Sequence, residues 1–280
     1  MIRIILDGRT GNNMFQYAAG RALAIKHNTS LILDGAWADA RHARQFEQLL
    51  RLPLNARYER SFSLTKRALR KAMAMHPETL HRGEFLKELY PKPDPAFYDL
   101  PDNSLLIGFF QMPFYFKDIE DSLRKELDLK LLNLPAESLR FEQILQTETT
   151  VSVHVRRGDY VGIYSTHCLE EDYHVRAIQH FRDRIPNVRF CVFSDDIPWC
   201  RQQFVGSEFL FCDLPGAATD PLHDLRVMSS CKHHIVVNSS YSWWGAWLNL
   251  SPDKIVIAPT MWMTNVPGTY AFPKEWRRLQ

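Results

Sequence analysis

The chain of 280 residues lacks three features, each of which would mark a class of protein. No hydrophobic run is long enough for a membrane span or a signal peptide, because the N-terminal apolar stretch 2–6 is short and is interrupted by Arg3. No large net charge is present, since 34 basic residues face 32 acidic ones, and this argues against nucleic acid as the partner. The five cysteines lie in the second half and include no C-x-x-C pair. We therefore expect free thiols in a cytoplasmic protein, with neither a disulfide framework nor a zinc site.

The length of the chain and a proline-containing segment near its middle predict two domains. A chain of this size exceeds the usual single domain, so two domains of about 130–150 residues are expected, each large enough to bury a core. The segment Asn133-Leu134-Pro135 is the candidate linker. The predicted domains are therefore residues 1–134 and 135–280, with the C-terminal tail available to pack back on the first domain.

The most informative stretch is 151–160, V-S-V-H-V-R-R-G-D-Y. Its valines alternate with polar residues, a pattern typical of a strand. Gly158 allows a sharp turn, so Arg156 and Arg157 are expected where a strand runs out into a loop, the place where open α/β sheets bind ligands. Guanidinium groups match phosphate oxygens, and Asp159 is close enough to orient one of them. A diphosphate clamp is one interpretation, and an Arg–Asp surface pair at a strand end is the other.

Two further predicted strands end in polar residues. The strand 187–193 ends in Ser194-Asp195-Asp196, whose carboxylates could accept hydrogen bonds from guanine or could cap the next helix through Ser194 or Asp195. The strand 234–237 runs through the turn Asn238-Ser239-Ser240-Tyr241-Ser242 into a helix, and hydroxyls at a helix start favour an anion. Capping explains one of these polar residues, not four. On a Rossmann-like sheet all three strand ends would converge on one nucleoside diphosphate.

The first half of the chain is less specific. The strand 2–6, the glycine-punctuated turn 7–12 and the helix 14–25 predict a strand–loop–helix unit in which Asn12 faces the ligand. The aromatic segment 109–116 either lines a sugar site or, more often for such residues, packs in the core. The basic run 57–71 is either a solvated helix face or a weak peripheral contact with the inner face of a membrane.

Together these motifs resemble those of the α-1,2-fucosyltransferases. The resemblance rests on H-V-R-R-G-D-Y (154–160), V-F-S-D-D (192–196), S-S-C-K-H-H-I-V-V-N-S-S-Y-S-W-W-G-A-W-L-N (229–249) and G-N-N-M-F-Q-Y-A-A-G-R-A-L-A (11–24), which cover both halves in the correct order. It implies an α/β fold of the GT-B type, with two Rossmann-like domains facing across a cleft, the first binding acceptor and the second GDP-fucose. It also implies metal-independent, inverting transfer of L-fucose from GDP-β-L-fucose to the 2-hydroxyl of a galactoside-terminated oligosaccharide, as in the synthesis of O-antigen or another surface glycan.

The resemblance also implies roles for single residues. Arg156 would contact the β-phosphate, Asp195 would contact guanine, and Asn12 would reach the diphosphate or the fucose from the first domain. The expected catalytic residues are Arg156, Asn12 and Asp159, and the expected substrate-binding residues are His154, Arg157, Asp195, Asn238, Ser239, Ser240 and Ser242.

Two departures from the family pattern, and the general base, leave alternatives open. The family usually has G-G-L-G-N-Q where this chain has G-R-T-G-N-N at 8–13, and a polar residue where it has Met112-Pro113. A GDP-sugar or glycan-binding protein of the same fold without transfer activity is therefore an alternative. A nucleotide hydrolase is disfavoured because no P-loop is present. The base could be Asp159, Asp7 or His167, or the proton could leave without a strong base.

Overall fold

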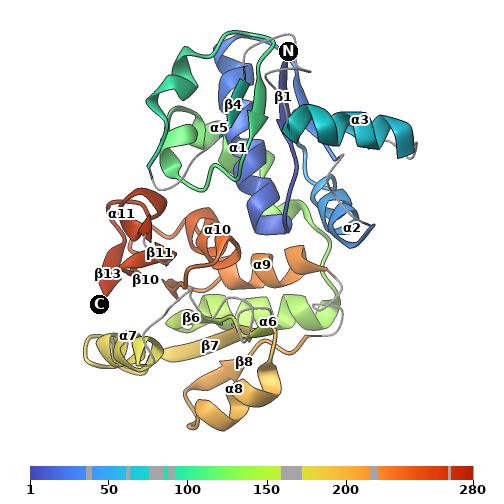
Figure 1. Ribbon diagram of the computed structural model, residues 1–280. Helices are drawn as coiled ribbons and strands as arrows, with labels where there is room; N and C mark the ends of the chain where they lie inside the picture. The colour runs from blue at the N-terminus through green and yellow to red at the C-terminus, as the bar shows by residue number, and fades with distance from the viewer. Residues whose placement is uncertain are drawn as a thin grey trace. The chain divides into compact units, whose positions relative to one another are not determined.

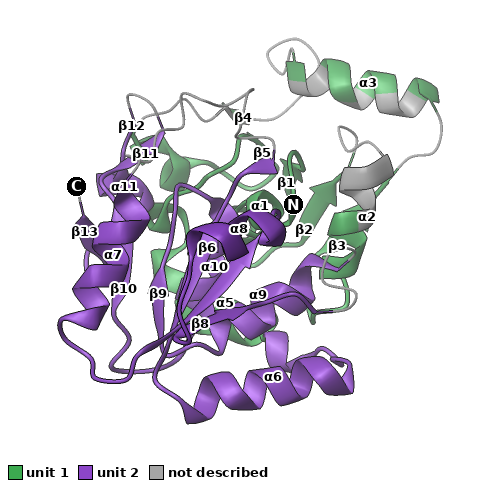
Figure 2. Cartoon of the chain, turned by 90° about the horizontal axis from the view of Figure 1, so that it is seen from below, with its two compact units in different colours: residues 1–128 green, residues 129–280 purple. Residues whose placement is uncertain are grey.

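The computed structural model describes residues 1–279 apart from 36–39, 61–63, 76–84, 88–91, 159–171, 215–219 and 264–265, and the side chains of 40–44, 66–67, 70, 73–74, 85 and 87 also lie outside this description. The chain divides into two compact units, Met1–Asp128 and Leu129–Gln280, which Figure 2 colours separately. Each unit contains a parallel sheet with helices, which confirms the predicted α/β class.

The first unit is built on a five-stranded parallel sheet in the order β3-β2-β1-β5-β4. The edge strands β3 and β4 were not predicted, because three residues are too few to show a period. Helix α1 packs against β1 and β2 (Figure 1). The elements are β1 Ile2–Ile5, α1 Thr10–Lys26, β2 Leu31–Asp34, α2 Ala40–Leu49, β3 Arg57–Glu59, α3 Leu64–Met75, β4 Phe85–Lys87, β5 Leu105–Ile107 and α5 Glu120–Glu126, with short 3₁₀ helices at Pro95–Asp99, Pro113–Tyr115 and Lys117–Ile119.

The second unit is built on a six-stranded parallel sheet in the order β13-β10-β9-β6-β7-β8. The predicted strand at 151–155 is the central strand β6, and every one of its residues is buried. Its polar residues therefore do not mark a solvent face, and Ser152 instead hydrogen-bonds Nδ1 of His234 at 2.7 Å. The elements are a 3₁₀ turn Leu129–Leu131, α6 Ala136–Thr147, β6 Thr150–Val155, α7 Tyr173–Arg182, β7 Arg189–Ser194, α8 Ile197–Gln203, β8 Phe209–Phe211, α9 Pro221–Ser229, β9 His233–Ile235, α10 Ser240–Leu248, β10 Val256–Pro259, β11 Met261–Met263, β12 Val266–Pro267, α11 Gly268–Ala271 and β13 Arg277–Leu279.

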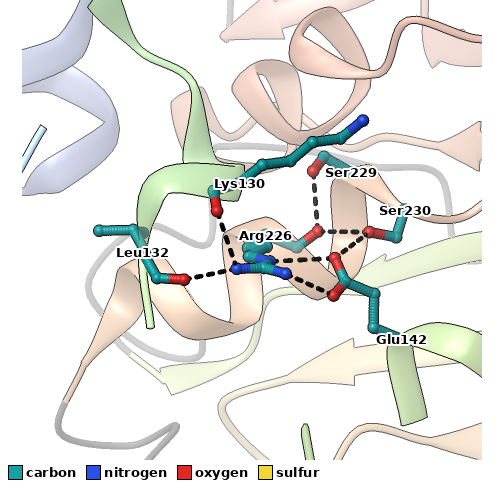
Figure 3. Close-up of polar contacts among 6 residues, drawn as sticks. All are labelled: Lys130, Leu132, Glu142, Arg226, Ser229 and Ser230. Atoms are coloured by element: carbon teal, nitrogen blue, oxygen red, sulfur yellow. Dashed lines mark hydrogen bonds and ion pairs between the residues drawn. The ribbon is translucent and has the colours of Figure 1, made fainter. Parts of the chain in front are cut away.

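The segment that leads into α6 is tied to the second unit by Arg226 of α9 (Figure 3). The guanidinium donates to the main-chain carbonyls of Lys130 and Leu132, and it forms a bidentate pair with Glu142 of α6 at 3.0 and 2.7 Å. The hydroxyl of Ser230 donates to the same carboxylate at 2.8 Å. These contacts explain why the division into units falls after Asp128, before the boundary at 134 that was predicted from the linker sequence.

Three smaller expectations also have an outcome. The four cysteines that the structure describes, Cys191, Cys200, Cys212 and Cys231, are free, as predicted, and they are also buried. In the aromatic segment, Phe110, Met112, Tyr115 and Phe116 are fully buried, so core packing accounts for most of it. The last strand, β13, joins the sheet of the second unit beside β10.

Candidate functional site

The strand order of the second sheet creates a switch point beside β6. After β6 the chain adds β7 and β8 on one side, and it then returns to add β9 and β10 on the other. Ligands of open α/β sheets bind outside the carboxyl ends of the strands at such a reversal. The two predicted segments Arg156–Arg157 and Asn238–Ser242 follow β6 and β9, the strands that flank this reversal. The topology thus brings two of the three predicted strand ends to a ligand position, and β7 supplies the third.

Arg156 and Arg157 meet Asp195 at the ends of β6 and β7. The two strands are parallel with Val155 opposite Ser194, so the residues that follow each strand lie side by side. Nη1 of Arg156 is 2.7 Å from Oδ2 of Asp195. The main-chain N–H of Arg157 donates to Oδ1 of the same carboxylate at 2.9 Å. One aspartate therefore holds the guanidinium of the first arginine and the backbone of the second.

Gly158 allows this close approach. A Cβ atom at position 158 would lie 2.4 Å from Oδ2 of Asp195, far closer than any van der Waals contact. A side chain there would displace the carboxylate that orients Arg156. The glycine was predicted from the need for a turn, whereas its contact with Asp195 gives the stronger physical reason.

Asp196 has a different task from its neighbour. Its Oδ1 accepts the N–H of Trp199 at 3.1 Å and so caps α8, while its Oδ2 is 3.1 Å from Nε of Arg157. The alternative that Ser194 or Asp195 caps this helix is wrong, because the N-cap residue is Asp196. Asp195 is exposed and is bound instead to the arginine segment. The two aspartates that looked equivalent in sequence thus differ in their contacts, because only Asp196 is the N-cap residue of α8.

His154 is buried and uncharged. Burial, the charge of Arg156 and the proximity of His174 lower its pKa to about 3. Its Nδ1 has no hydrogen-bond partner among the residues that the structure describes, and its ring lies 5.9 Å from that of Tyr241. A neutral imidazole cannot supply positive charge to a phosphate at neutral pH. The position of His154 between Arg156 and α10 therefore favours a packing contribution to the site.

The start of α10 carries the predicted serines. Ser239 is the N-cap residue with extended backbone, and its side chain makes no capping hydrogen bond to the described helix. Ser242 is fully buried, and its Oγ accepts the N–H of Val237 and donates to the carbonyl of Ser239, both at 3.4 Å. Its hydroxyl thus stabilises the turn itself. Because α10 starts at Ser240, Ser240 and Ser242 belong to its first turn, earlier than the helix start predicted at 243.

The glycine-rich segment of the first unit is a helix start as well. Helix α1 begins at Thr10, so Asn12, which was expected in the preceding turn, lies in its first turn. Oδ1 of Asn12 accepts a hydrogen bond from Nε2 of Gln111 at 2.7 Å. Gly8 has a φ of 75°, a left-handed conformation that favours glycine, and a Cβ there would clash with the Asn12 amide. The geometry of this turn therefore depends on Gly8, despite the unusual Arg9-Thr10 that follows it.

The remaining candidates have simple outcomes. Asp159 and His167 lie outside the described residues, and Asp7 hydrogen-bonds its own turn through the N–H of Gly8 at 2.7 Å. Among the residues that the structure describes, no group of three or more His, Cys, Asp or Glu side chains is arranged to hold a metal ion. Trp199, which stacks on Arg157, was missed because contacts between distant segments leave no periodic signal in sequence.

Two sequence relatives match almost the whole chain, and a third matches about half of it. It is 32% identical over 297 residues to an alpha-1,2-colitosyltransferase of Escherichia coli, which covers 98% of this chain and 97% of the relative. It is 31% identical over 301 residues to the O-antigen biosynthesis glycosyltransferase WbnK of Escherichia coli, with 98% and 99% covered. A galactoside alpha-(1,2)-fucosyltransferase 1 of Bos taurus is 30% identical over 165 residues, which are 55% of this chain and 45% of that protein.

A solved structure and a family profile complete the comparison. The glycosyl transferase family 9 protein of Veillonella parvula aligns with a TM-score of 0.51 at 9% identity, covering 99% of this chain and 85% of that one, which supports the predicted GT-B type of fold. The profile described as Glycosyl transferase family 11 matches residues 1–280. With its full-length relatives and the profile match along its whole length, the chain belongs to glycosyl transferase family 11.

Proposed function

We propose that this protein is an inverting glycosyltransferase that moves L-fucose from GDP-β-L-fucose to the 2-hydroxyl of a terminal galactoside. The observation that carries the proposal is the Arg156–Asp195 pair at the switch point of the second sheet, in a chain of glycosyl transferase family 11. The name of the bovine relative, a galactoside α-(1,2)-fucosyltransferase, agrees with this activity, and the name of WbnK agrees with an acceptor in O-antigen synthesis.

The reaction requires one bond to form and one to break at the anomeric carbon. The acceptor oxygen bonds to that carbon and loses its proton, while GDP leaves with the electron pair of the carbon–oxygen bond. Negative charge grows on the β-phosphate as the bond breaks, so a guanidinium that is placed there in advance stabilises the transition state. Arg156 is suited to this task, because Asp195 fixes the orientation of its planar group at 2.7 Å.

The other residues are proposed to bind the donor around this arginine. A carboxylate has about four lone-pair sites, so Asp195 can accept hydrogen bonds from the arginine segment and from guanine at the same time. The start of α10 offers Ser239 and Ser240 to the diphosphate. Asn12 is proposed to contact the donor from the first unit. The proposed supporting residues, which shape the site without meeting the phosphate, are His154, Arg157, Asn238 and Ser242.

Acceptor-dependent release of GDP is the sharpest test of this proposal. Colitose is fucose without its 3-hydroxyl group, and one full-length relative is named a colitosyltransferase, so GDP-colitose is the second candidate donor. We expect purified protein to release GDP from GDP-fucose only when a galactoside is present, and to form an α-1,2 linkage that NMR of the product identifies. GDP should inhibit more strongly than UDP or ADP, because only guanine presents the pair of N–H donors that the Asp195 carboxylate is proposed to bind. Release without acceptor would indicate a hydrolase, and binding without release a glycan-binding protein.

Metal independence is part of the proposal and has its own expected result. The proposed diphosphate site is lined by Arg156, serine hydroxyls and a helix start, all of which favour an anion, and a cation beside guanidinium groups would be repelled. We expect the initial rate to be unchanged in excess EDTA and on addition of Mg²⁺ or Mn²⁺. Loss of activity in EDTA, with recovery on adding a divalent ion, would reassign Asp195 and Asp196 as metal ligands.

A peripheral membrane contact remains a prediction for the first unit. No helix among the described residues is long and apolar enough to cross a bilayer. On α3, however, Leu64, Leu69 and Met75 are 80%, 63% and 59% exposed, in a helix that also contains Lys66, Arg67, Arg70 and Lys71 and no acidic residue. An apolar face bordered by basic residues suits an anionic lipid surface. Co-sedimentation with anionic but not neutral vesicles, lost in Leu64→Ser/Leu69→Ser, is the measurement that decides it.

A further inference from the structure

Trp199 lies beside the proposed site without a role in the motifs or in the reaction. It belongs to the first turn of α8 and is partly exposed. The guanidinium carbon of Arg157 is 3.8 Å from the centroid of its ring, which is close stacking on the aromatic face. Such a cation is attracted by the negative face of the indole, and this attraction increases when water is excluded.

Arg157 is held by two further contacts besides this stack. Its Nε is 3.1 Å from Oδ2 of Asp196, and its main-chain N–H donates to Asp195 at 2.9 Å. Asp196 is itself fixed, since its other oxygen accepts the N–H of Trp199 at 3.1 Å. The Arg157 guanidinium thus lies between the carboxylate and the ring of one helix start. The Arg157 guanidinium therefore contacts the start of α8, whereas the Arg156 guanidinium contacts Asp195.

The same short segment places Arg156. The N–H of Arg157 and Nη1 of Arg156 share the Asp195 carboxylate, at 2.9 and 2.7 Å. The carboxylate lies directly beside Gly158, where a Cβ would be 2.4 Å from its Oδ2, so Arg156, Arg157 and Gly158 all adjoin this one group. A shift of the Arg157 backbone must therefore change the geometry between Asp195 and Arg156.

We propose that Trp199 is a positioning residue: by stacking on Arg157 it fixes the segment that presents Arg156 to the diphosphate of the nucleotide. This inference rests on the proposed function, in which Arg156 meets the β-phosphate. Trp199 acts through Arg157 and not on the reacting atoms. The two adjacent arginines consequently have separate roles. Arg157 anchors the segment to α8, and Arg156 binds the diphosphate.

A double-mutant cycle tests this coupling. The variants are Trp199→Leu, Arg157→Met and the pair together, with the dissociation constant of GDP measured by calorimetry and kcat/KM measured for the donor. We expect Trp199→Leu to weaken GDP binding and to lower kcat/KM about tenfold, as loss of a partly buried cation–ring contact would. The double variant should be no worse than Arg157→Met, because both changes remove the same contact. Trp199→Phe keeps a ring and should stay within about threefold of wild type.

Phe211→Leu is the matched control. It removes another cation–ring contact of α8, in which the guanidinium of Arg201 lies 4.6 Å from the Phe211 centroid, and it should bind GDP like wild type. Additive losses in the double variant, or an equal loss in Trp199→Phe, would overturn the proposal. Wild-type protein that binds GDP but transfers no sugar would contradict the proposed function alone, since the cycle on GDP binding would still report the positioning role.

Discussion

Replacing Arg156 with alanine is expected to lower the rate of sugar transfer about 10²–10³-fold, the usual cost of removing one donor that stabilises transition-state charge. The loss should fall mainly on kcat, because charge on the β-phosphate increases as the bond to the sugar breaks. Arg156→Lys should also be badly impaired, since an ammonium group cannot reproduce the planar fork that Asp195 holds at 2.7 Å. Initial rates with saturating donor and acceptor measure this effect.

The matched control for Arg156 is Arg201→Ala on the same unit. Arg201 pairs with Asp213 at 3.4 Å with half of its side chain exposed, so its removal tests the general effect of losing one surface arginine. Its turnover and melting temperature should equal those of wild type. Near-normal turnover in a folded Arg156→Ala or Arg156→Lys protein would show that the leaving group is stabilised elsewhere.

Replacing Glu142 with alanine is expected to destabilise the second unit by about 3–5 kcal/mol, because it leaves the Arg226 guanidinium without its counter-charge in a site that is nearly buried. The exposed fractions of the two side chains are 12% for Arg226 and 7% for Glu142, so solvent screens this pair little. For a unit of this size such a loss lowers the melting temperature by roughly 6–20 °C. Calorimetric unfolding of the full chain measures it.

Two further variants separate the buried charge from the pair. Replacing both partners, with Arg226→Met and Glu142→Leu, should cost less than Glu142→Ala, since no charge is left buried without a partner. Glu148→Ala removes the more exposed ion pair with Arg189 and should change stability by less than about 1 kcal/mol. If Glu142→Ala melts like Glu148→Ala, the network in Figure 3 contributes little to the stability of the unit.

Residue pattern alone predicted the elements that lead into the site. The alternating valines of 151–155 and the hydrophobic residues of 187–193 predicted β6 and β7, since β-branched and aromatic residues favour strands. The starts of α1 and α10 were predicted four and three residues late, because Gly11-Asn12 and Ser240-Tyr241-Ser242 resemble turn sequence while the helix already includes them. Short edge strands such as β3 and β8 were missed, since only pairing with a neighbour makes three residues a strand.

The sequence by itself determined the fold class, the family and the chemical character of the three strand ends, because these depend on residue type and order along the chain. Only the tertiary structure decided how neighbouring residues divide their tasks. Asp195 binds the arginine segment while Asp196 caps α8, and Ser242 hydrogen-bonds the backbone of its own turn. Trp199 contacts Arg157 although the two residues are far apart in the sequence. Such assignments depend on distances between segments that are remote in sequence, and packing of the whole sheet sets those distances.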